Sequence, residues 1–296
     1  MKSQTAAYKY ALLAIFLWST VASAFKVALM YLTPYELVFY AVLTSTITLF
    51  IIVLYQKKIS VVKEHIKSNF KSTLLLGVIN PFLYYIVLFK AYDLLPAQEA
   101  QAINYTWALM LALLSVVFLK QKLTLNDIVA GIVCYFGVLI ISTKGEPFSL
   151  NFSNLDGVGL ALFSTILWSM YWIFNTKSKV EPIVGLFSNF LVSLPIIFIF
   201  LILSQPLQIP HINGIFAGIY VGLFEMGITF LFWLNAMQKA ISTSKIANLI
   251  FISPFLSLVF IHLIVGEEIY ISTVFGLTTI IFGLIIQQLK TKKNQV

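Results

Sequence analysis

Leu17-Trp18-Ser19-Thr20 recurs 150 positions later in the 296-residue chain as Leu167-Trp168-Ser169-Met170. Both copies lie inside long apolar runs, and each run becomes polar near its end, at Lys26 in the first copy and at Asn175 in the second. A four-residue match is weak by itself. If the chain is duplicated, other landmarks must recur at nearly the same spacing.

Further residues do recur at a similar spacing. The matched pairs are Gly77 with Gly222, Ala91 with Ala236, Ala100 with Ala247, and Gln121 with Glu268, each 145 or 147 positions apart. The small drift in the offset is what short loop insertions would give. We therefore predict two related halves, 1–145 and 146–296, within one integrated domain.

Composition places this domain in a membrane. The chain is 60% hydrophobic and only 10% charged, with a mean hydropathy of +0.95. A soluble protein carries roughly 25% charged residues. Repeated apolar runs of about 20 residues indicate transmembrane helices, because lipid forces the backbone to pair its polar groups internally. The expected fold is an all-α integral membrane protein.

The sequence predicts ten membrane spans joined by short connections, the longest of which are the polar stretches 56–71 and 143–155. The expected spans are 9–31, 35–55, 72–92, 97–119, 124–142, 156–176, 182–203, 213–236, 241–265 and 269–289.

The lysines are sorted by membrane side. With the N-terminus inside, sixteen of them fall on inner connections and tails, two (Lys90 and Lys144) on outer connections, and Lys26 within a span. The inner group is Lys2, Lys9, Lys57, Lys58, Lys63, Lys67, Lys71, Lys120, Lys122, Lys177, Lys179, Lys239, Lys245, Lys290, Lys292 and Lys293. This bias predicts a cytoplasmic (inner) membrane protein with both termini cytoplasmic. It also accounts for the +8 net charge without a nucleic-acid partner.

Each half has five expected spans, and two copies of an odd-span unit must insert in opposite directions. Inverted repeats of this kind occur in many secondary transporters, where the solute binds near the middle of the membrane. We therefore expect ten helices in two inverted five-helix repeats around a central cavity that opens to either side in turn.

Several motifs resemble the EamA-type branch of the drug/metabolite transporter superfamily. They are Pro254, Gly266-Glu267-Glu268, Gly276 and Gly283 in the second half, and Leu17-Trp18-Ser19-Thr20 with Lys26, Asn104-Tyr105-x-Trp107 and Gln121-Lys122 in the first. The resemblance covers essentially the whole chain and implies the ten-helix architecture. The first half is similar to the bacterial aromatic amino acid exporters, which implies export of an amino acid. Two departures, Ala108 in place of a proline and Asn80-Pro81 where an acidic residue is expected, bear on the solute more than on the fold.

Glu225 is the sharpest candidate for a functional residue. It lies about twelve residues into the eighth expected span, where a carboxylate costs roughly 2.5–3.5 kcal/mol on insertion scales. It should therefore be protonated, paired or facing water. The functional interpretation is a partner for a solute amine or a proton carrier, and the structural alternative is a hydrogen bond to a neighbouring helix.

Three other polar residues join Glu225 as solute-binding candidates. Lys26 lies about five residues from the outer end of its span, so it either snorkels to the surface or pairs with a carboxylate of the solute or of Glu225. Asn80 occupies the place in the first half that matches Glu225 in the second. Asn80 and Asn104 either bind solute or make interhelical hydrogen bonds worth about 0.6 kcal/mol each.

Aromatic residues complete the expected site. Trp107, Trp168, Tyr171, Trp172 and Tyr84 fall in spans that should line the cavity. The functional interpretation is stacking and cation–π contact with an aromatic or cationic solute. The alternative is ordinary packing against lipid or other helices, since aromatic residues make up 15% of the chain.

The pattern favours a secondary transporter over an enzyme. No catalytic residue, metal site or cofactor is expected, because the three histidines are dispersed, Cys134 is single, and protease, hydrolase and nucleotide-binding motifs are missing from the sequence. The expected partners are a small-molecule solute, the lipid bilayer and, as a candidate coupling ion, the proton. The sequence does not indicate an oligomeric state.

Other functions remain open alternatives. Within the class, these are import of a nucleotide-like metabolite and export of cationic drugs. Outside it, they are an intramembrane enzyme and a membrane scaffold without transport.

Overall fold

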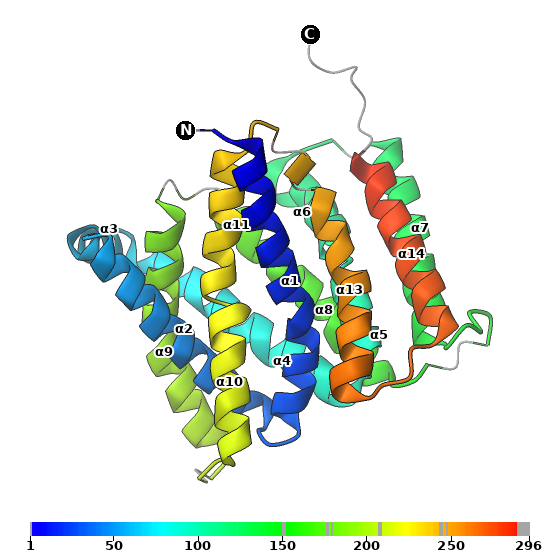
Figure 1. Cartoon of the computed structure of the whole chain (residues 1–296), viewed down its shortest axis with the longest axis horizontal. Coiled ribbons are helices and arrows are strands. Elements are labelled where there is room, and N and C mark those ends of the chain that lie inside the picture. The colour runs from blue at the N-terminus through cyan, green and yellow to red at the C-terminus, as the bar shows by residue number, and fades with distance from the viewer. Residues whose placement is uncertain are drawn as a thin grey trace. The chain divides into compact units, whose positions relative to one another are not determined.

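The computed structural model describes residues 2–122, 124–149, 152–175, 178, 180–206, 209–242, 245–246 and 248–288, with the side chains of Asn248 and Gln288 left aside. Helices dominate these residues and no strand occurs among them (Figure 1). The prediction of an all-α membrane protein is confirmed. Ala247, Lys177, Lys179, Lys290, Lys292 and Lys293, which the sequence analysis used, lie outside the described residues.

The helical elements follow the expected spans in order. Those of the first half are α1 (Gln4–Leu29), α2 (Pro34–Tyr55), α3 (Ile59–Gly77), the π-helix η1 (Val78–Leu83), α4 (Tyr84–Leu94), α5 (Ala97–Asn104), α6 (Trp107–Leu119) and α7 (Leu125–Ser142). Those of the second half are α8 (Leu155–Asn175), α9 (Pro182–Ser204), α10 (Ile212–Phe224), α11 (Ile228–Lys239), η2 (Asn248–Ile252), α13 (Ser253–Phe260), η3 (Ile261–Val265) and α14 (Ile271–Gln288).

Eight helical stretches of the described chain are long and apolar enough to cross a membrane. They are Gln4–Leu29, Pro34–Tyr55, Ile59–Leu94, Ala97–Leu119, Leu125–Ser142, Leu155–Asn175, Pro182–Ser204 and Ile212–Lys239. Two shorter apolar helices, Leu249–Val265 and Ile271–Gln287, fall within the ninth and tenth expected spans. The chain is a multi-pass membrane protein, and the count of ten spans stays a prediction.

Capping boxes fix the start of two of the spanning helices. Thr33 precedes α2, and its backbone N–H donates to Glu36 while its side chain accepts from the Glu36 N–H. Thr124 and Asp127 make the same reciprocal pair at the start of α7. Each box satisfies two backbone groups that a helix start leaves unpaired, so both helices begin at a defined residue.

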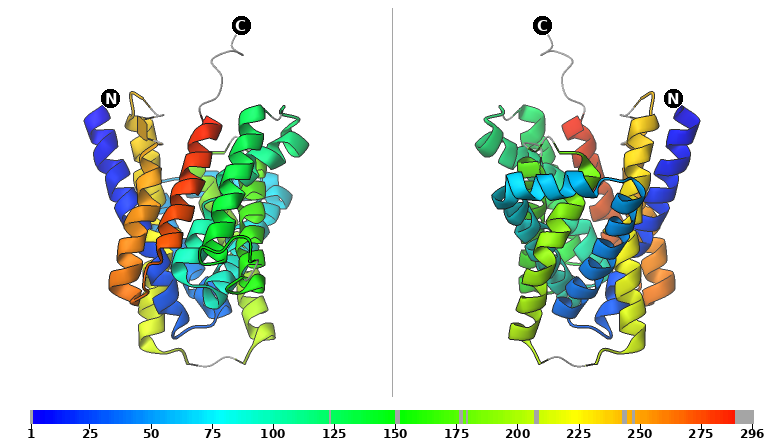
Figure 2. Two further views of the ribbon diagram at one scale, coloured as in Figure 1. Left: turned by 90° about the vertical axis from the view of Figure 1, so that its right-hand side faces the viewer. Right: turned by 90° about the vertical axis from the view of Figure 1, so that its left-hand side faces the viewer.

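The stretch 56–71 was predicted to be a polar connection between spans, but most of it is helical, because α3 begins at Ile59. Val62 is buried, and Ile59 and Ile66 are half-buried, so apolar residues at helical spacing line one side of a polar segment. The backbone leaves helical geometry at Asn69. In the right-hand view of Figure 2, this first part of α3 lies across the direction of α9.

The chain divides into two compact units, each of which contains parts of both halves. The first comprises Met1–Phe89 and Lys179–Glu267, and the second comprises Lys90–Ser178 and Glu268–Val296. In the first unit α1 packs against α10, α11 and α13, while α9 packs against α2 and α3 (Figure 1). In the second unit α14 packs along α7, and α8 packs against α5 and α6 (left view of Figure 2).

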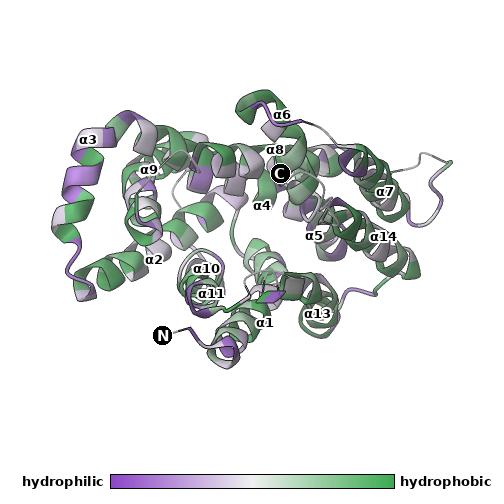
Figure 3. Cartoon of the chain, turned by 90° about the horizontal axis from the view of Figure 1, so that it is seen from above, coloured by the Kyte–Doolittle hydropathy of each residue, from purple (hydrophilic) through white to green (hydrophobic). Residues whose placement is uncertain are grey.

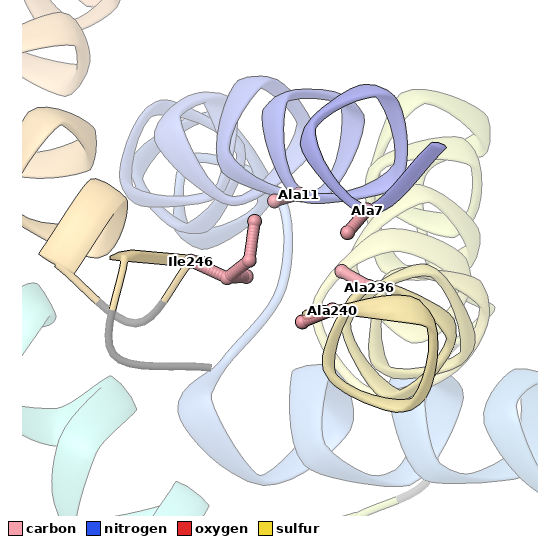
Figure 4. Packing of buried hydrophobic residues seen from close by; sticks show 5 residues of the cluster. All are labelled: Ala7, Ala11, Ala236, Ala240 and Ile246. Atoms are coloured by element: carbon pink, nitrogen blue, oxygen red, sulfur yellow. The ribbon is translucent and has the colours of Figure 1, made fainter. Parts of the chain in front are cut away.

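Small residues allow close helix contacts in both units. Ala7, Ala11, Ala236 and Ala240 meet where the start of α1 lies against the end of α11, with Ile246 beside them (Figure 4). In the second unit, a Cβ added to Gly137 of α7 would lie 2.6 Å from the Gly276 carbonyl oxygen of α14. Such approaches are typical of helix packing in membranes, where van der Waals contact replaces the hydrophobic effect.

Contacts between connections agree with the sidedness that the lysines predict. In the first unit, Ser3 donates its N–H to the Lys239 carbonyl, and Lys58 pairs with Glu181; all four lie on predicted inner segments. In the second unit, Lys144 of a predicted outer connection lies over the ring of Tyr270, at the outer end of the tenth expected span, with 5.8 Å between Nζ and the ring centroid.

Candidate functional site

Glu225 stands at a break in a membrane span. It follows the last residue of α10, about halfway along the candidate span Ile212–Lys239, and Gly227 two residues later has non-helical dihedrals (φ −120°, ψ −99°). Two carbonyl oxygens at the break accept hydrogen bonds from hydroxyls: Thr229 Oγ1 donates to Phe224 O (2.5 Å), and Ser45 Oγ donates to Met226 O (3.0 Å). Pairing of this kind is what makes irregular backbone tolerable at membrane depth.

The Glu225 carboxylate has a partner from the first half of the chain. Tyr85, near the start of α4, donates its hydroxyl to Glu225 Oε1 at 3.1 Å. Tyr85 is almost fully buried, whereas Glu225 is half-buried. The predicted site residue Tyr84 packs its ring against that of Tyr85, with 4.7 Å between the centroids. Tyr85 was not among the predicted site residues, and the structure shows that it is the hydrogen-bond donor to Glu225.

Asn80 lies at a matching break in the first half. Its dihedrals (φ −144°, ψ 118°) interrupt the helical path at η1, 145 positions before Glu225, and the peptide bond to Pro81 is cis. The Asn80 side chain is 3% exposed, and within the described residues its Oδ1 has no hydrogen-bond partner. A buried amide oxygen without a partner is costly, so this group is suited to accept a hydrogen bond from a ligand or water.

A glycine stands three residues before each break. A Cβ on Gly77 would lie 2.6 Å from the Asn189 carbonyl oxygen of α9. A Cβ on Gly222 would overlap the carbonyl oxygen of Ala41 on α2. The helix therefore packs closely against α9 just before the first break and against α2 just before the second. In both places the backbones are so close that only glycine fits.

Lys26 lies in the last turn of α1 and is half-buried. A basic side chain there is favoured by the helix dipole as well as by the membrane surface. This position fits both interpretations of Lys26, as a snorkelling residue and as a partner for a solute carboxylate.

Thr20 and Tyr220 form a polar link that the sequence analysis missed. Their hydroxyl oxygens lie 2.7 Å apart, joining α1 to α10 in the first unit. Thr20 belongs to the repeated Leu-Trp-Ser-Thr stretch. In the sequence, Tyr220 is a single hydroxyl in an apolar run, and nothing there indicates its partner. The hydrogen bond with Thr20 depends on the packing of α1 against α10.

The remaining five predicted residues lie together in the second unit. Asn104, at the end of α5, donates from Nδ2 to Ser164 Oγ of α8 at 3.0 Å. Trp107, at the start of α6, accepts at its carbonyl from Ser169 Oγ of α8 at 3.0 Å. Both hydrogen bonds tie the break between α5 and α6 to α8.

The aromatic rings of this group also contact one another. Trp168 lies edge-to-face with Trp107 (centroids 6.5 Å apart) and with Trp172 (5.9 Å), and it stacks on Tyr171 (5.7 Å). Within the described residues, the buried Nε1 of Trp172 has no hydrogen-bond partner. We call Asn104, Trp107, Trp168, Tyr171 and Trp172 the α8 cluster.

The two copies of the repeated tetrapeptide have partly corresponding surroundings. Trp18 packs against Phe230 and Trp233 of α11, each with 5.6 Å between centroids, whereas Trp168 packs against α6. The helices that carry them do match, because α1 packs on α13 and α8 packs on α6. In the predicted repeat, α13 and α6 belong to the fourth spans of the two halves.

Comparison with known proteins agrees with this architecture. The sequence model of the EamA-like transporter family matches residues 5–143 and 155–287. An uncharacterized transporter of Archaeoglobus fulgidus is 23% identical over 278 residues, which cover 93% of this chain and 95% of that protein. The uncharacterized transporter YoaV of Bacillus subtilis is 24% identical over 286 residues, with 95% and 96% covered.

A solved crystal structure has the same fold. It aligns with a TM-score of 0.67 at 20% identity and covers 98% of this chain and 100% of its own. Fold, helix breaks and relatives together define a membrane transporter. The chain belongs to the EamA-like transporter family.

Proposed function

We propose that this protein is a secondary transporter that exports a small zwitterionic metabolite, most simply an amino acid, by alternating access. The observation that carries the proposal is the hydrogen bond from Tyr85 to Glu225 at a helix break halfway along a span. Discontinuous helices of this kind form the solute and ion sites of many secondary transporters.

The inverted repeat of halves 1–145 and 146–296 is part of the proposal. It is supported by the matching breaks at Asn80 and Glu225, by the glycine that precedes each, and by the two stretches that match the family model. The inner-membrane location and the cytoplasmic termini rest on the lysine distribution, and the export direction rests on the resemblance to aromatic amino acid exporters.

Glu225 sets the chemistry of the solute. A half-buried carboxylate at membrane depth binds an amine or a proton, because either neutralises a charge that is expensive there. It is unfavourable for a phosphate, which argues against a nucleotide-like solute at this position. Tyr84 contacts Tyr85, the donor to Glu225. Asn80 is proposed to accept a hydrogen bond from the solute, and Lys26 is proposed to bind the solute carboxylate.

We propose that the α8 cluster forms an aromatic surface that binds the solute. Its rings offer faces for stacking, and Trp172 offers an N–H donor without a partner among the described residues. Export of cationic drugs is the second candidate, since a carboxylate and aromatic rings also suit an organic cation.

Flux into and out of proteoliposomes tests the proposal. Purified protein would be assayed against aromatic and aliphatic amino acids, a quaternary ammonium drug and a nucleotide, with and without a pH gradient. We expect flux of an amino acid. This flux should rise when the proton gradient drives protons in the direction opposite to the movement of the amino acid. Flux of the drug alone would favour the second candidate, and no flux of any amino acid would overturn the first.

A further inference from the structure

The first part of α3 is a basic segment. Between residues 57 and 71 the chain carries five lysines and a single acid, Glu64. Lys58 is already paired with Glu181. Lys63, Lys67 and Lys71 are exposed, and within the described residues their ammonium groups have neither an ion-pair nor a hydrogen-bond partner. Hydrophilic residues are correspondingly concentrated on α3 in Figure 3.

The backbone directs this segment along the surface. Lys57, with φ +56°, turns the chain just after α2 ends, and the helical path is interrupted again at Asn69. The part between these points lies across α9, a candidate span, as the right-hand view of Figure 2 shows. A helix in this orientation runs near the plane of the lipid headgroups.

Apolar side chains accompany the lysines. Val62 is buried against the protein, while Val61 and Phe70 are 46% and 51% exposed. An amphipathic helix that has basic residues on its polar face and exposed apolar residues nearby is typical of the membrane interface. Lys63 and Lys67 are one helical turn apart, so their like charges repel each other unless an anion lies between them.

We propose that the basic surface formed by Lys63, Lys67 and Lys71 binds the phosphate groups of anionic phospholipids. The lysines supply the charge, and Val61 and Phe70 lie in the apolar part of the interface. Each basic residue near an anionic membrane surface adds to the electrostatic attraction, and the three lysines together should strengthen lipid binding more than tenfold. The inference depends on membrane insertion and not on the proposed solute.

The test measures thermal unfolding of the purified full chain in neutral detergent, titrated with phosphatidylglycerol or with phosphatidylcholine. Phosphatidylglycerol should raise the unfolding temperature at a concentration at least tenfold lower than phosphatidylcholine. The variant K63Q/K67Q/K71Q should lose this preference, whereas K63R/K67R/K71R and the control K120Q/K122Q, at another predicted inner connection, should keep it.

Two further measurements, at high salt and with free phosphate, test whether the effect depends on charge and on the lipid. High salt should weaken the phosphatidylglycerol effect on the wild-type protein, which remains measurable even if the glutamine variant does not fold. Inorganic phosphate and glycerol phosphate should have no comparable effect. An unchanged preference in K63Q/K67Q/K71Q, an effect insensitive to salt, or an equal effect of free phosphate would overturn the proposal.

Discussion

Tyr85 and Glu225, 140 positions apart, are joined by a 3.1 Å hydrogen bond at the break between α10 and α11. A hydrogen bond to a charged group contributes about 1.5–3 kcal/mol, so this bond fixes the orientation of the carboxylate. Tyr85→Phe should lower flux about tenfold while preserving the fold. Tyr55→Phe, at the exposed end of α2, is the control and should leave flux unchanged. Equal flux in both variants would show that the bond is dispensable.

The glycines that precede the breaks should tolerate no side chain. Gly77→Ala and Gly222→Ala bring a methyl group against a backbone carbonyl, so each should destabilise the protein by about 1–3 kcal/mol. Gly159→Ala is the matched control, because nothing lies within 4 Å of its added Cβ, and there alanine should stabilise α8 slightly. Thermal unfolding of the three variants measures the difference. Similar unfolding temperatures would contradict the close contacts.

Ser45 should act as a positioning residue for Glu225. Its hydroxyl is the donor to the Met226 carbonyl, and Ser45→Ala leaves that carbonyl unpaired at a cost of about 1–3 kcal/mol. We expect reduced flux together with a lower unfolding temperature. Thr46→Val removes a neighbouring hydroxyl that bonds only within α2, to Val42, and should have a smaller effect on flux. A larger loss of flux in Thr46→Val than in Ser45→Ala would refute this role.

Gln98 should hold the start of α14 in the second unit. It donates to the Glu268 carbonyl (2.8 Å) and accepts from the Tyr270 N–H (3.2 Å) and the Thr273 hydroxyl (2.7 Å). Gln98→Leu removes all three bonds, so hydrogen exchange of residues 268–273 should become faster. Thr278→Val, which removes an exposed bond within α14, is the control. Unchanged exchange in Gln98→Leu would mean that the connection is held elsewhere.

The predicted topology can be read from cysteine labelling of intact cells. The native Cys134 is fully buried and should give little background. A membrane-impermeant maleimide should label Lys144→Cys from outside and should label Lys2→Cys only after permeabilisation. The opposite pattern would place the termini outside and invert the proposed orientation.

The sequence predicted the class of fold more readily than the helix breaks or the contacts. Composition and lysine sorting indicate membrane spans because lipid excludes charge along the whole segment. The match of Asn80 with Glu225 pointed to equivalent places in the two halves. In contrast, the bond from Tyr85 depends on the register between α4 and the α10–α11 break, which no local pattern encodes.

The beginning of α3 shows a different kind of error. Its lysines suggested a polar connection, but Val62 and Ile66 are spaced one helical turn apart and form the inward side of a helix. The apolar residues there have helical periodicity, but the prediction of a connection followed the high charge of the segment instead. Asn69, where the helix bends, gave no such signal.

Glu225 itself provides the most direct test of the account. Flux of the amino acid identified in proteoliposomes would be compared between the wild-type protein, Glu225→Gln and Glu146→Gln, with and without a pH gradient. Glu146 is an exposed carboxylate on a predicted outer connection, so its variant should behave like the wild type. We predict that Glu225→Gln loses gradient-driven flux by at least about a hundredfold, since an amide neither carries a proton nor pairs with an amine. Gradient-driven flux equal to wild type in Glu225→Gln would contradict the account.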